Sequence, residues 1–156
     1  MENVHIRPLI DTDFDGCMDL YRYLHAEDDP PPPPETLHAV WNALISDPQT
    51  ICLGAFTGER MVAVCNAQVV RNLTRAARPY AVVENVVTHP DFRRRGIGRD
   101  LLMELISRCD QFDCYKIMLM SASRRTEAHA FYRSIGFDDS AKRAFVLSRR
   151  DLLRAQ

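Results

Sequence analysis

The chain has 156 residues, enough for one hydrophobic core and too few for two independent ones. Hydrophobic residues make up 46% of it and charged residues 26%, the balance of an ordinary globular protein. The formal net charge of −1 excludes a general electrostatic attraction to nucleic acid or to an anionic membrane. No apolar run approaches the roughly 20 residues that span a bilayer. We therefore expect a single domain over residues 1–156, with no nucleic-acid or membrane partner.

The N-terminal residues and the cysteines indicate where the protein works. The N-terminus has no basic stretch followed by an apolar one, as a secretory signal would have. The five cysteines are odd in number, and no two have the C-x-x-C spacing of a metal or redox motif. No two of the five histidines share metal-ligand spacing. We expect a cytoplasmic protein with reduced cysteines and no metal.

The first third of the sequence predicts one strand and two helices. The alternating residues Val4–Pro8 predict the strand. Asp13 can cap a helix whose apolar stripe runs to Leu24. The run Pro30–Pro34 cannot continue a helix, so we expect a rigid loop there. Apolar residues at helical spacing over Leu37–Ile45 predict the second helix.

Three strands follow in the middle of the chain. Thr50–Phe56 and Met61–Val70 predict a hairpin, with its turn at Thr57–Arg60. A basic loop, Arg71–Arg78, then leads into the valine-rich strand Tyr80–Thr88. The two-residue alternation and the turn residues favour antiparallel pairing here.

The last third of the sequence alternates helices and strands. Ile97–Ile106 carries a helical apolar stripe, and Tyr115–Met120 is a short apolar strand. Ala128–Ile135 predicts a further helix, closed by Gly136 at its C-cap. Phe145–Leu147 predicts a last strand. The order β-α-α-β-β-β-α-β-α-β indicates one α/β domain: a mixed, mostly antiparallel sheet flanked by about four helices.

One segment points to phosphate binding. Arg93-Arg94-Arg95-Gly96-Ile97-Gly98, which we call the phosphate cradle, follows a strand and opens a helix. Glycines let the backbone approach a ligand closely, and free N–H groups in the first turn of a helix bind anions. Arginines add charge-assisted hydrogen bonds to phosphate oxygens. A dinucleotide fingerprint is excluded, because Leu101 stands where its third glycine belongs, and no Walker loop is present.

The cradle resembles the [QR]-x-x-G-x-[GA] signature of the GCN5-related N-acetyltransferases, the GNAT superfamily. Residues 128–137, Ala-His-Ala-Phe-Tyr-Arg-Ser-Ile-Gly-Phe, resemble the second signature of the same family, A-x-x-F-Y-x-x-x-G-F. The resemblance covers most of the chain, because the element order also agrees. It implies an acetyl-CoA-dependent enzyme that needs no metal. It is also compatible with a homodimer, although the residues indicate no interface.

The resemblance implies roles for particular residues. The cofactor pyrophosphate would rest on the cradle and on Arg99, and pantetheine would pair with the amides of Val86, Val87 and Thr88. Tyr132 would be the acid that protonates the departing CoA thiolate. In many members an asparagine near the start of this helix contacts pantetheine. Here Arg125 or Thr126 stands there, which leaves that contact in doubt.

The base and the acceptor are less clearly indicated. Glu84 is a carboxylate in an apolar strand, where burial would make it a better proton acceptor; an outward-facing residue or an ordered water as base are the alternatives. His89, at a strand end, could shuttle protons or be a structural loop residue. The acidic run Glu27-Asp28-Asp29 could hold a cationic acceptor.

The loop arginines Arg71, Arg75 and Arg78 could instead hold an acidic acceptor, so the sequence does not name the substrate. We expect an N-acetyltransferase that moves an acetyl group from acetyl-CoA to a primary amine by direct attack in a ternary complex. The acceptor would be a small molecule or a protein. The alternative from another class is a non-catalytic acyl-CoA-binding regulatory module, which would keep the cradle and lack the chemistry.

Overall fold

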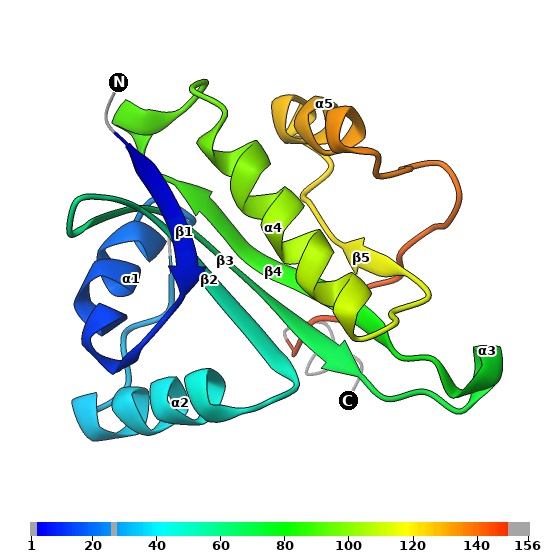
Figure 1. Ribbon diagram of the computed structural model, residues 1–156, viewed down its shortest axis with the longest axis horizontal. Helices are drawn as coiled ribbons and strands as arrows, with labels where there is room; N and C mark the ends of the chain where they lie inside the picture. The colour runs from blue at the N-terminus through cyan, green and yellow to red at the C-terminus, as the bar shows by residue number, and fades with distance from the viewer. Residues whose placement is uncertain (1–2, 26–27, 150–156) are drawn as a thin grey trace. The chain divides into compact units, whose positions relative to one another are not determined.

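The computed structural model describes residues 3–25 and 28–149 and divides the chain after Leu119 into two units. The strands all lie in the first unit: β1 (Val4–Pro8), β2 (Thr50–Thr57), β3 (Arg60–Val70), β4 (Tyr80–Thr88) and β5 (Ile117–Leu119). They form one sheet in the order β1-β2-β3-β4-β5 (Figure 1). Neighbours are antiparallel from β1 to β4, and β5 pairs with β4 in parallel. The predicted mixed, mostly antiparallel sheet is confirmed.

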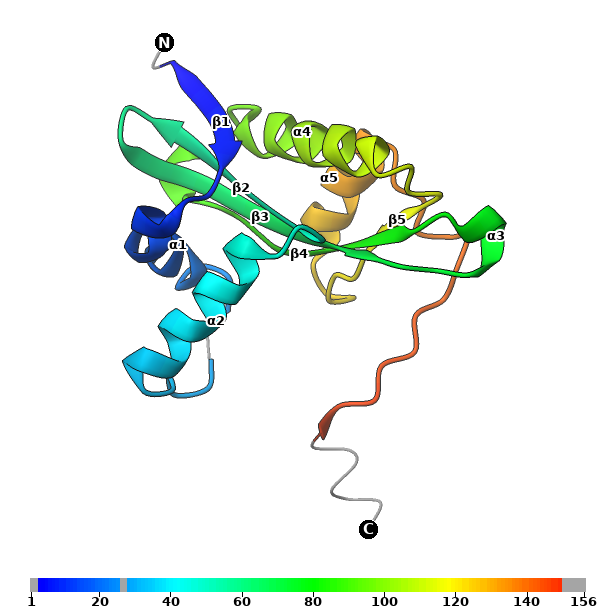
Figure 2. The same ribbon diagram turned by 60° about the horizontal axis from the view of Figure 1, so that its bottom comes forward.

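Three helices cover the two faces of this sheet. α1 (Phe14–Tyr21) and α2 (Pro34–Ser46) lie on one face, and α4 (Ile97–Gln111) lies on the other (Figure 2). The apolar stripe of α4 is buried against the strands, as helical periodicity predicts. Among the residues that the structure describes, no helix combines the length and apolarity needed to cross a bilayer. The buried residues of α4 are Ile97, Leu101, Leu102, Leu105 and Cys109.

The last two prolines of the run Pro30–Pro34 form the start of α2. Pro33 is the N-cap of α2 and Pro34 is its first residue, so the helix begins earlier than the apolar stripe indicates. Proline suits this position because its missing N–H would have had no intrahelical acceptor. The Pro33 carbonyl accepts the first bonds of the helix, from the amides of Thr36 and Leu37 at 3.0 Å and 3.2 Å.

Asp13 stands at the predicted start of α1 but does not cap it. Its carboxylate receives two hydrogen bonds from Arg7, of 2.6 Å and 2.9 Å, and one of 2.8 Å from the Ile10 amide. No side-chain hydrogen bond from Asp13 reaches α1, so the predicted capping bond is wrong. Burial of Asp13 opposes its ionisation, but the bonds from Arg7 and Ile10 outweigh it and lower the pKa of Asp13.

A β-bulge interrupts β4 at Asn85. Val64 pairs with Val87 while Asn66 pairs with Glu84, so one residue of β3 lies opposite two of β4. Asn85 has a φ of 54°, in the left-handed region that asparagine tolerates better than most residues. Because the extra residue shifts the side-chain alternation by one, Glu84 and Val87 both face α1 and α2.

The basic loop between β3 and β4 contains a short turn, labelled α3 (Thr74–Ala77). Arg75, Ala76 and Ala77 all have positive φ, between 57° and 59°. Three such residues in succession make a left-handed turn, which costs L-residues about 1–2 kcal/mol each. The sequence predicted only an irregular loop, since no glycine marks this turn.

The second unit contains α5 (Thr126–Ile135). Gly136 follows it as a left-handed C-cap with a φ of 114°, which confirms the predicted end of this helix. The predicted strand at Phe145–Leu147 is wrong, since residues 142–148 form neither strand nor helix and Phe145 is 91% exposed. Apolar residues make a strand only where a neighbouring strand supplies ladder bonds. Within residues 3–25 and 28–149 none pairs with this segment.

Candidate functional site

The N-terminus of α4 has an open first turn directly after the arginine run. Gly96 is the N-cap, with a φ of 84° that glycine adopts without strain. No side chain caps this end within the described parts of the chain, 3–25 and 28–149. The N–H groups of Ile97 and Gly98 have no intrahelical acceptor at these positions, and the helix dipole adds partial positive charge. This turn can therefore bind an anion through its backbone.

The three arginines of the cradle are exposed and differ in their contacts. Arg93 Nε donates a 3.0 Å hydrogen bond to the Thr88 carbonyl, which ties the turn to the end of β4. The Arg95 guanidinium lies 5.1 Å from the centroid of the Phe92 ring. Arg94 has a φ of 57°, so the chain bends sharply between its two neighbours. The arrangement places positive charge beside the open turn of α4.

The edge of β4 beyond the bulge directs two amides away from β3. The His89 N–H donates to the Val62 carbonyl of β3 at 2.9 Å. By strand alternation the Val87 N–H points to β3 as well, and the N–H groups of Val86 and Thr88 point to the opposite side. In the described part of the chain, β5 pairs with β4 only before the bulge. An extended ligand could thus pair with this edge as an added strand does.

Glu84 lies on the face of the sheet that α1 and α2 cover, directly opposite Asn66 on β3. Its side chain is exposed, so the burial expected from the apolar strand is wrong. The pairing of β4 with β5 ends at Val83, one residue before Glu84, and the bulge follows at Asn85. The carboxylate is accessible to a substrate amine and to water.

His89 makes contacts that hold the chain in place at the end of β4. It is the N-cap of η2 (Pro90–Phe92), where its Nδ1 accepts a 3.2 Å bond from the Asp91 amide. Its Nε2 lies 3.0 Å from Arg60 Nη2. These contacts fix the chain between β4 and the cradle.

Tyr132 lies on α5, in the second unit. Its ring is half-buried between two other aromatic rings, with centroids at 5.3 Å for Phe131 and 6.0 Å for Phe137. Arg125 is the N-cap of this helix and makes no side-chain capping bond. The tyrosine is thus held by its neighbours on the same helix and by the residue after the C-cap.

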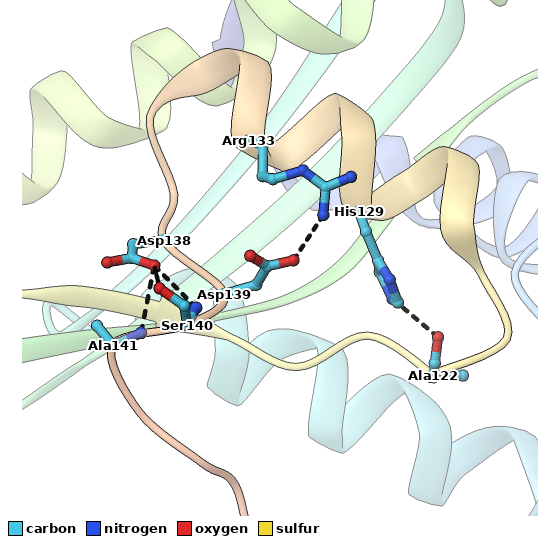
Figure 3. Close-up of polar contacts among 7 residues, drawn as sticks. All are labelled: Ala122, His129, Arg133, Asp138, Asp139, Ser140 and Ala141. Carbon is cyan, nitrogen blue, oxygen red and sulfur yellow. Dashed lines mark hydrogen bonds and ion pairs between the residues drawn. The ribbon is translucent and has the colours of Figure 1, made fainter.

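Polar contacts fix both ends of α5 (Figure 3). At its C-terminal end, Arg133 Nη1 binds Asp139 Oδ2 at 2.6 Å. At the other end, His129 Nε2 lies 3.0 Å from the Ala122 carbonyl oxygen. The Asp138 carboxylate closes the following turn, where it accepts hydrogen bonds from the Ser140 amide, the Ser140 hydroxyl and the Ala141 amide.

The charged segments that could bind the acceptor amine differ in their exposure and in their ion pairs. Glu27 lies outside the described residues, and Asp28–Asp29 is exposed. Arg71 is also exposed, whereas Arg78 forms a 3.0 Å ion pair with Asp113. Arg78 is therefore already engaged in holding the base of its loop.

The five cysteines are free thiols, and burial raises the pKa of each. The pKa rises to about 11 for Cys17 and Cys52 and to about 12 for Cys109. Only the thiolate is a good nucleophile, so these side chains are poor acyl acceptors near neutral pH. No group of three or more His, Cys, Asp or Glu side chains could hold a metal ion in the described part of the chain.

Comparison with known proteins gives consistent matches. The model of the Acetyltransferase (GNAT) family matches residues 17–137. Glucosamine 6-phosphate N-acetyltransferase of Trypanosoma brucei brucei is 31% identical over 78 residues, which cover 50% of this chain and 51% of the relative. [Ribosomal protein bS18]-alanine N-acetyltransferase of Salmonella typhimurium is 33% identical over 71 residues, covering 46% and 48%. The matched region thus spans about half the length of these curated relatives.

Solved structures agree over almost the full chain. A protein of Agrobacterium tumefaciens str. C58 assigned to the acetyltransferases has a TM-score of 0.86 and 35% identity, covering 93% of this chain and 99% of that one. The aminoglycoside enzyme AAC(6')-Iy, solved with a bisubstrate analogue containing CoA, shares the fold with a TM-score of 0.77 and 16% identity, covering 94% and 99%. Since the family model spans both predicted signatures, this chain belongs to the Acetyltransferase (GNAT) family, whose enzymes use acetyl-CoA.

Proposed function

We propose that this protein transfers the acetyl group of acetyl-CoA to a primary amine by direct attack within a ternary complex. The observation that carries the proposal is the start of α4 at Gly96, where no side chain makes a capping bond within the described residues and which lies beside three exposed arginines. Such a turn suits a diphosphate, and because enzymes of this family use acetyl-CoA, that diphosphate would be the one in CoA.

The edge of β4 would bind the rest of the donor. The amides of Val86 and Thr88 point away from β3, so they can donate to the carbonyl groups of pantetheine. The Val87 amide points toward β3 instead, so the hydrogen bond expected from this amide to pantetheine is not part of the proposal. Binding at both ends would fix the thioester near the bulge, close to Glu84.

Acetyl transfer needs one proton removed from the acceptor ammonium and one proton supplied to the departing thiolate. Glu84, or a water that it binds, would take a proton from the acceptor ammonium, which frees the nitrogen lone pair. That pair forms the C–N bond at the thioester carbonyl, and the C–S bond breaks with its electrons on sulfur. Tyr132 would donate a proton to the departing thiolate. The products are an acetylated amine and free CoA.

Direct attack is favoured over transfer through an acetylated cysteine. A cysteine relay needs a reactive thiolate, and burial raises the pKa of all five thiols. The amine itself is then the nucleophile.

The test is CoA thiol release from acetyl-CoA across a panel of primary amines. We expect turnover that Tyr132→Phe and Glu84→Gln each lower roughly 100- to 10,000-fold, with CoA affinity unchanged. Matched controls are Tyr115→Phe, which removes a phenol elsewhere, and Glu59→Gln in the hairpin turn. Saturable CoA binding with no turnover on any amine would favour the non-catalytic acyl-CoA-binding module instead.

A further inference from the structure

The outer side of β5 is an open edge of the sheet. β5 is the last strand in the sheet order, and within the described residues no strand pairs with its outer side (Figure 1). The Lys116 carbonyl accepts a 3.0 Å bond from the Ala81 amide of β4. By strand alternation, the N–H and C=O groups of Ile117 and Leu119 point away from β4. An edge of this kind can pair with a strand of another chain.

The second unpaired feature is residues 143–147, Arg-Ala-Phe-Val-Leu, which we call the apolar segment. Its three large apolar side chains are exposed, Phe145 at 91%, Val146 at 72% and Leu147 at 68%. Within the described part of the chain, no backbone hydrogen bond joins these three residues to another segment. Aromatic and β-branched residues favour strands, and a run of consecutive exposed apolar residues in a folded protein indicates a functional surface. The apolar segment therefore has the composition of a strand and lacks a neighbouring strand.

The open edge and the apolar segment are complementary in one antiparallel register. This register places Leu147 opposite Ile117 and Phe145 opposite Leu119. The outward N–H and C=O groups of β5 then face those of the apolar segment, and each of the two pairs exchanges hydrogen bonds in both directions. The backbone groups that β5 directs away from β4 are all used.

The same register also matches the side chains. Leu119 pairs with Val83 of β4, whose side chain is buried on the face that α4 covers. Phe145, opposite Leu119, would lie on this face, because directly opposed side chains share a face. Val146 would lie opposite Met118 on the other face, where Met118 is 39% exposed. A shift by one residue would exchange the two faces, so the side chains favour this register.

We propose that the apolar segment of one copy pairs with β5 of a second copy, so that two chains exchange these segments in a symmetric dimer. A second copy supplies both missing partners at once, since each chain carries one apolar segment and one open edge. Within the described residues the chain does not pair its apolar segment with its own β5. A strand from a different protein would cover β5 but leave Phe145–Leu147 exposed. This inference does not depend on the proposed acetyl transfer, because neither the phosphate cradle nor Glu84 takes part in the pairing.

Paired cysteines identify the chain that supplies the added strand. The Cα atoms of a non-hydrogen-bonded antiparallel pair lie about 4.5 Å apart, a separation that a disulfide can span. Met118→Cys protein mixed with Val146→Cys protein and then oxidised should give a covalent dimer with one chain of each kind. Either variant alone should stay unlinked, as should wild type, whose own cysteines are all buried or half-buried. Met118→Cys mixed with Phe145→Cys, whose side chain lies on the opposite face in this register, is the matched control and should also stay unlinked.

Proline substitutions test the ladder bonds of the same contact. Sedimentation equilibrium of the full chain should show a dimer. Leu147→Pro removes an amide that bonds β5, and because the dimer loses this bond twice, its dissociation constant should rise at least tenfold. Val146→Pro removes an amide that points away from β5, so the dissociation constant should rise by about threefold or less. The thermal unfolding of each variant checks that it folds.

The outcomes separate a second copy from the other possible partners of β5. If the chain is a monomer and a Met118→Cys/Val146→Cys double variant forms its disulfide within one chain, the segment pairs with its own β5 and the exchange is overturned. A monomer with no disulfide in any of these variants would overturn the strand addition itself. A dimer that Leu147→Pro and Val146→Pro weaken equally would use a different interface, which also overturns the proposal. Acetyl transfer is measured separately, so it can fail or succeed independently of each of these results.

Discussion

Arg93 Nε donates a 3.0 Å hydrogen bond to the Thr88 carbonyl, and this bond joins the phosphate cradle to the last residue of β4. The two backbone segments proposed to hold CoA are thus connected through one side chain. The bond also uses a carbonyl that points away from β3, which leaves the Thr88 amide directed to the same open side.

Replacement of Arg93 by lysine should separate charge from geometry. Lysine keeps the positive charge but lacks the planar guanidinium that bonds Thr88 while facing the ligand. We expect Arg93→Lys to weaken CoA binding by about 1 kcal/mol, roughly five- to tenfold in Kd, measured by calorimetry. Arg22→Lys, in an exposed ion pair with Asp19 on the surface, is the control and should leave the Kd unchanged. An equal Kd for wild type and Arg93→Lys would contradict the role of this bond.

Gly96→Ala tests the start of α4. A Cβ at Gly96 would meet no atom within 4 Å, so a clash plays no part; the φ of 84° is what disfavours alanine, by about 1 kcal/mol. The first turn should shift to relieve this strain, and CoA affinity should fall by at least fivefold. Gly58→Ala in the hairpin turn, with a φ of 56° and equally open surroundings, carries the same kind of strain away from the cradle. A similar loss of affinity in both variants would indicate a general effect of stability.

The Arg7–Asp13 pair predicts a specific pH dependence of stability. The pKa of Asp13 is lower in the folded chain than in the unfolded one, so the unfolded state binds the proton more readily at acid pH. The stabilisation is complete above the unfolded pKa of about 4 and is lost as the pH falls through the lower, folded pKa. Urea unfolding from pH 7 downward should show this loss.

Asp13→Asn should remove about 2 kcal/mol from the free energy of unfolding at pH 7, because Asp13 is 8% exposed and accepts three hydrogen bonds. The variant should approach the wild type in stability at the acid end. Asp19→Asn, which breaks only an exposed pair, should have a much smaller effect. A constant difference between wild type and Asp13→Asn at all pH values would be inconsistent with the lowered pKa.

The raised thiol pKa values predict slow alkylation of the folded chain. Near neutral pH, Cys17 and Cys52, each with a pKa of about 11, should react with iodoacetamide far more slowly than in denaturant. The half-buried Cys114 should react first. Peptide mass spectrometry gives this order. Rapid labelling of Cys17 or Cys52 in the folded chain would reopen the possibility of a cysteine relay.

Local pattern predicts much of the fold. The strands Val4–Pro8 and Tyr80–Thr88 have the bounds that their sequence indicates, because alternation, valine content and flanking prolines all agree there. Gly136 marks the end of α5 for a local reason, its left-handed φ. The strand expected at Phe145–Leu147 has no such local determinant, since it depends on a pairing partner elsewhere in the chain.

Features of the site that depend on pairing register could not be predicted in the same way. The bulge at Asn85 arises from how β4 aligns with β3, and it decides which face Glu84 occupies. Asn66 did not stand out in the sequence, where it is one polar residue in an apolar strand. The pairing register alone places it directly opposite Glu84.

The most direct test of the central claim is backbone amide NMR during titration with CoA and, separately, with pantetheine. CoA should shift the amides of Ile97 and Gly98 in the open turn of α4, together with those of Val86 and Thr88 on the edge of β4. Pantetheine lacks the diphosphate and should shift only the pair on β4. Unchanged α4 amides at saturating CoA would contradict the proposal that this turn holds the diphosphate.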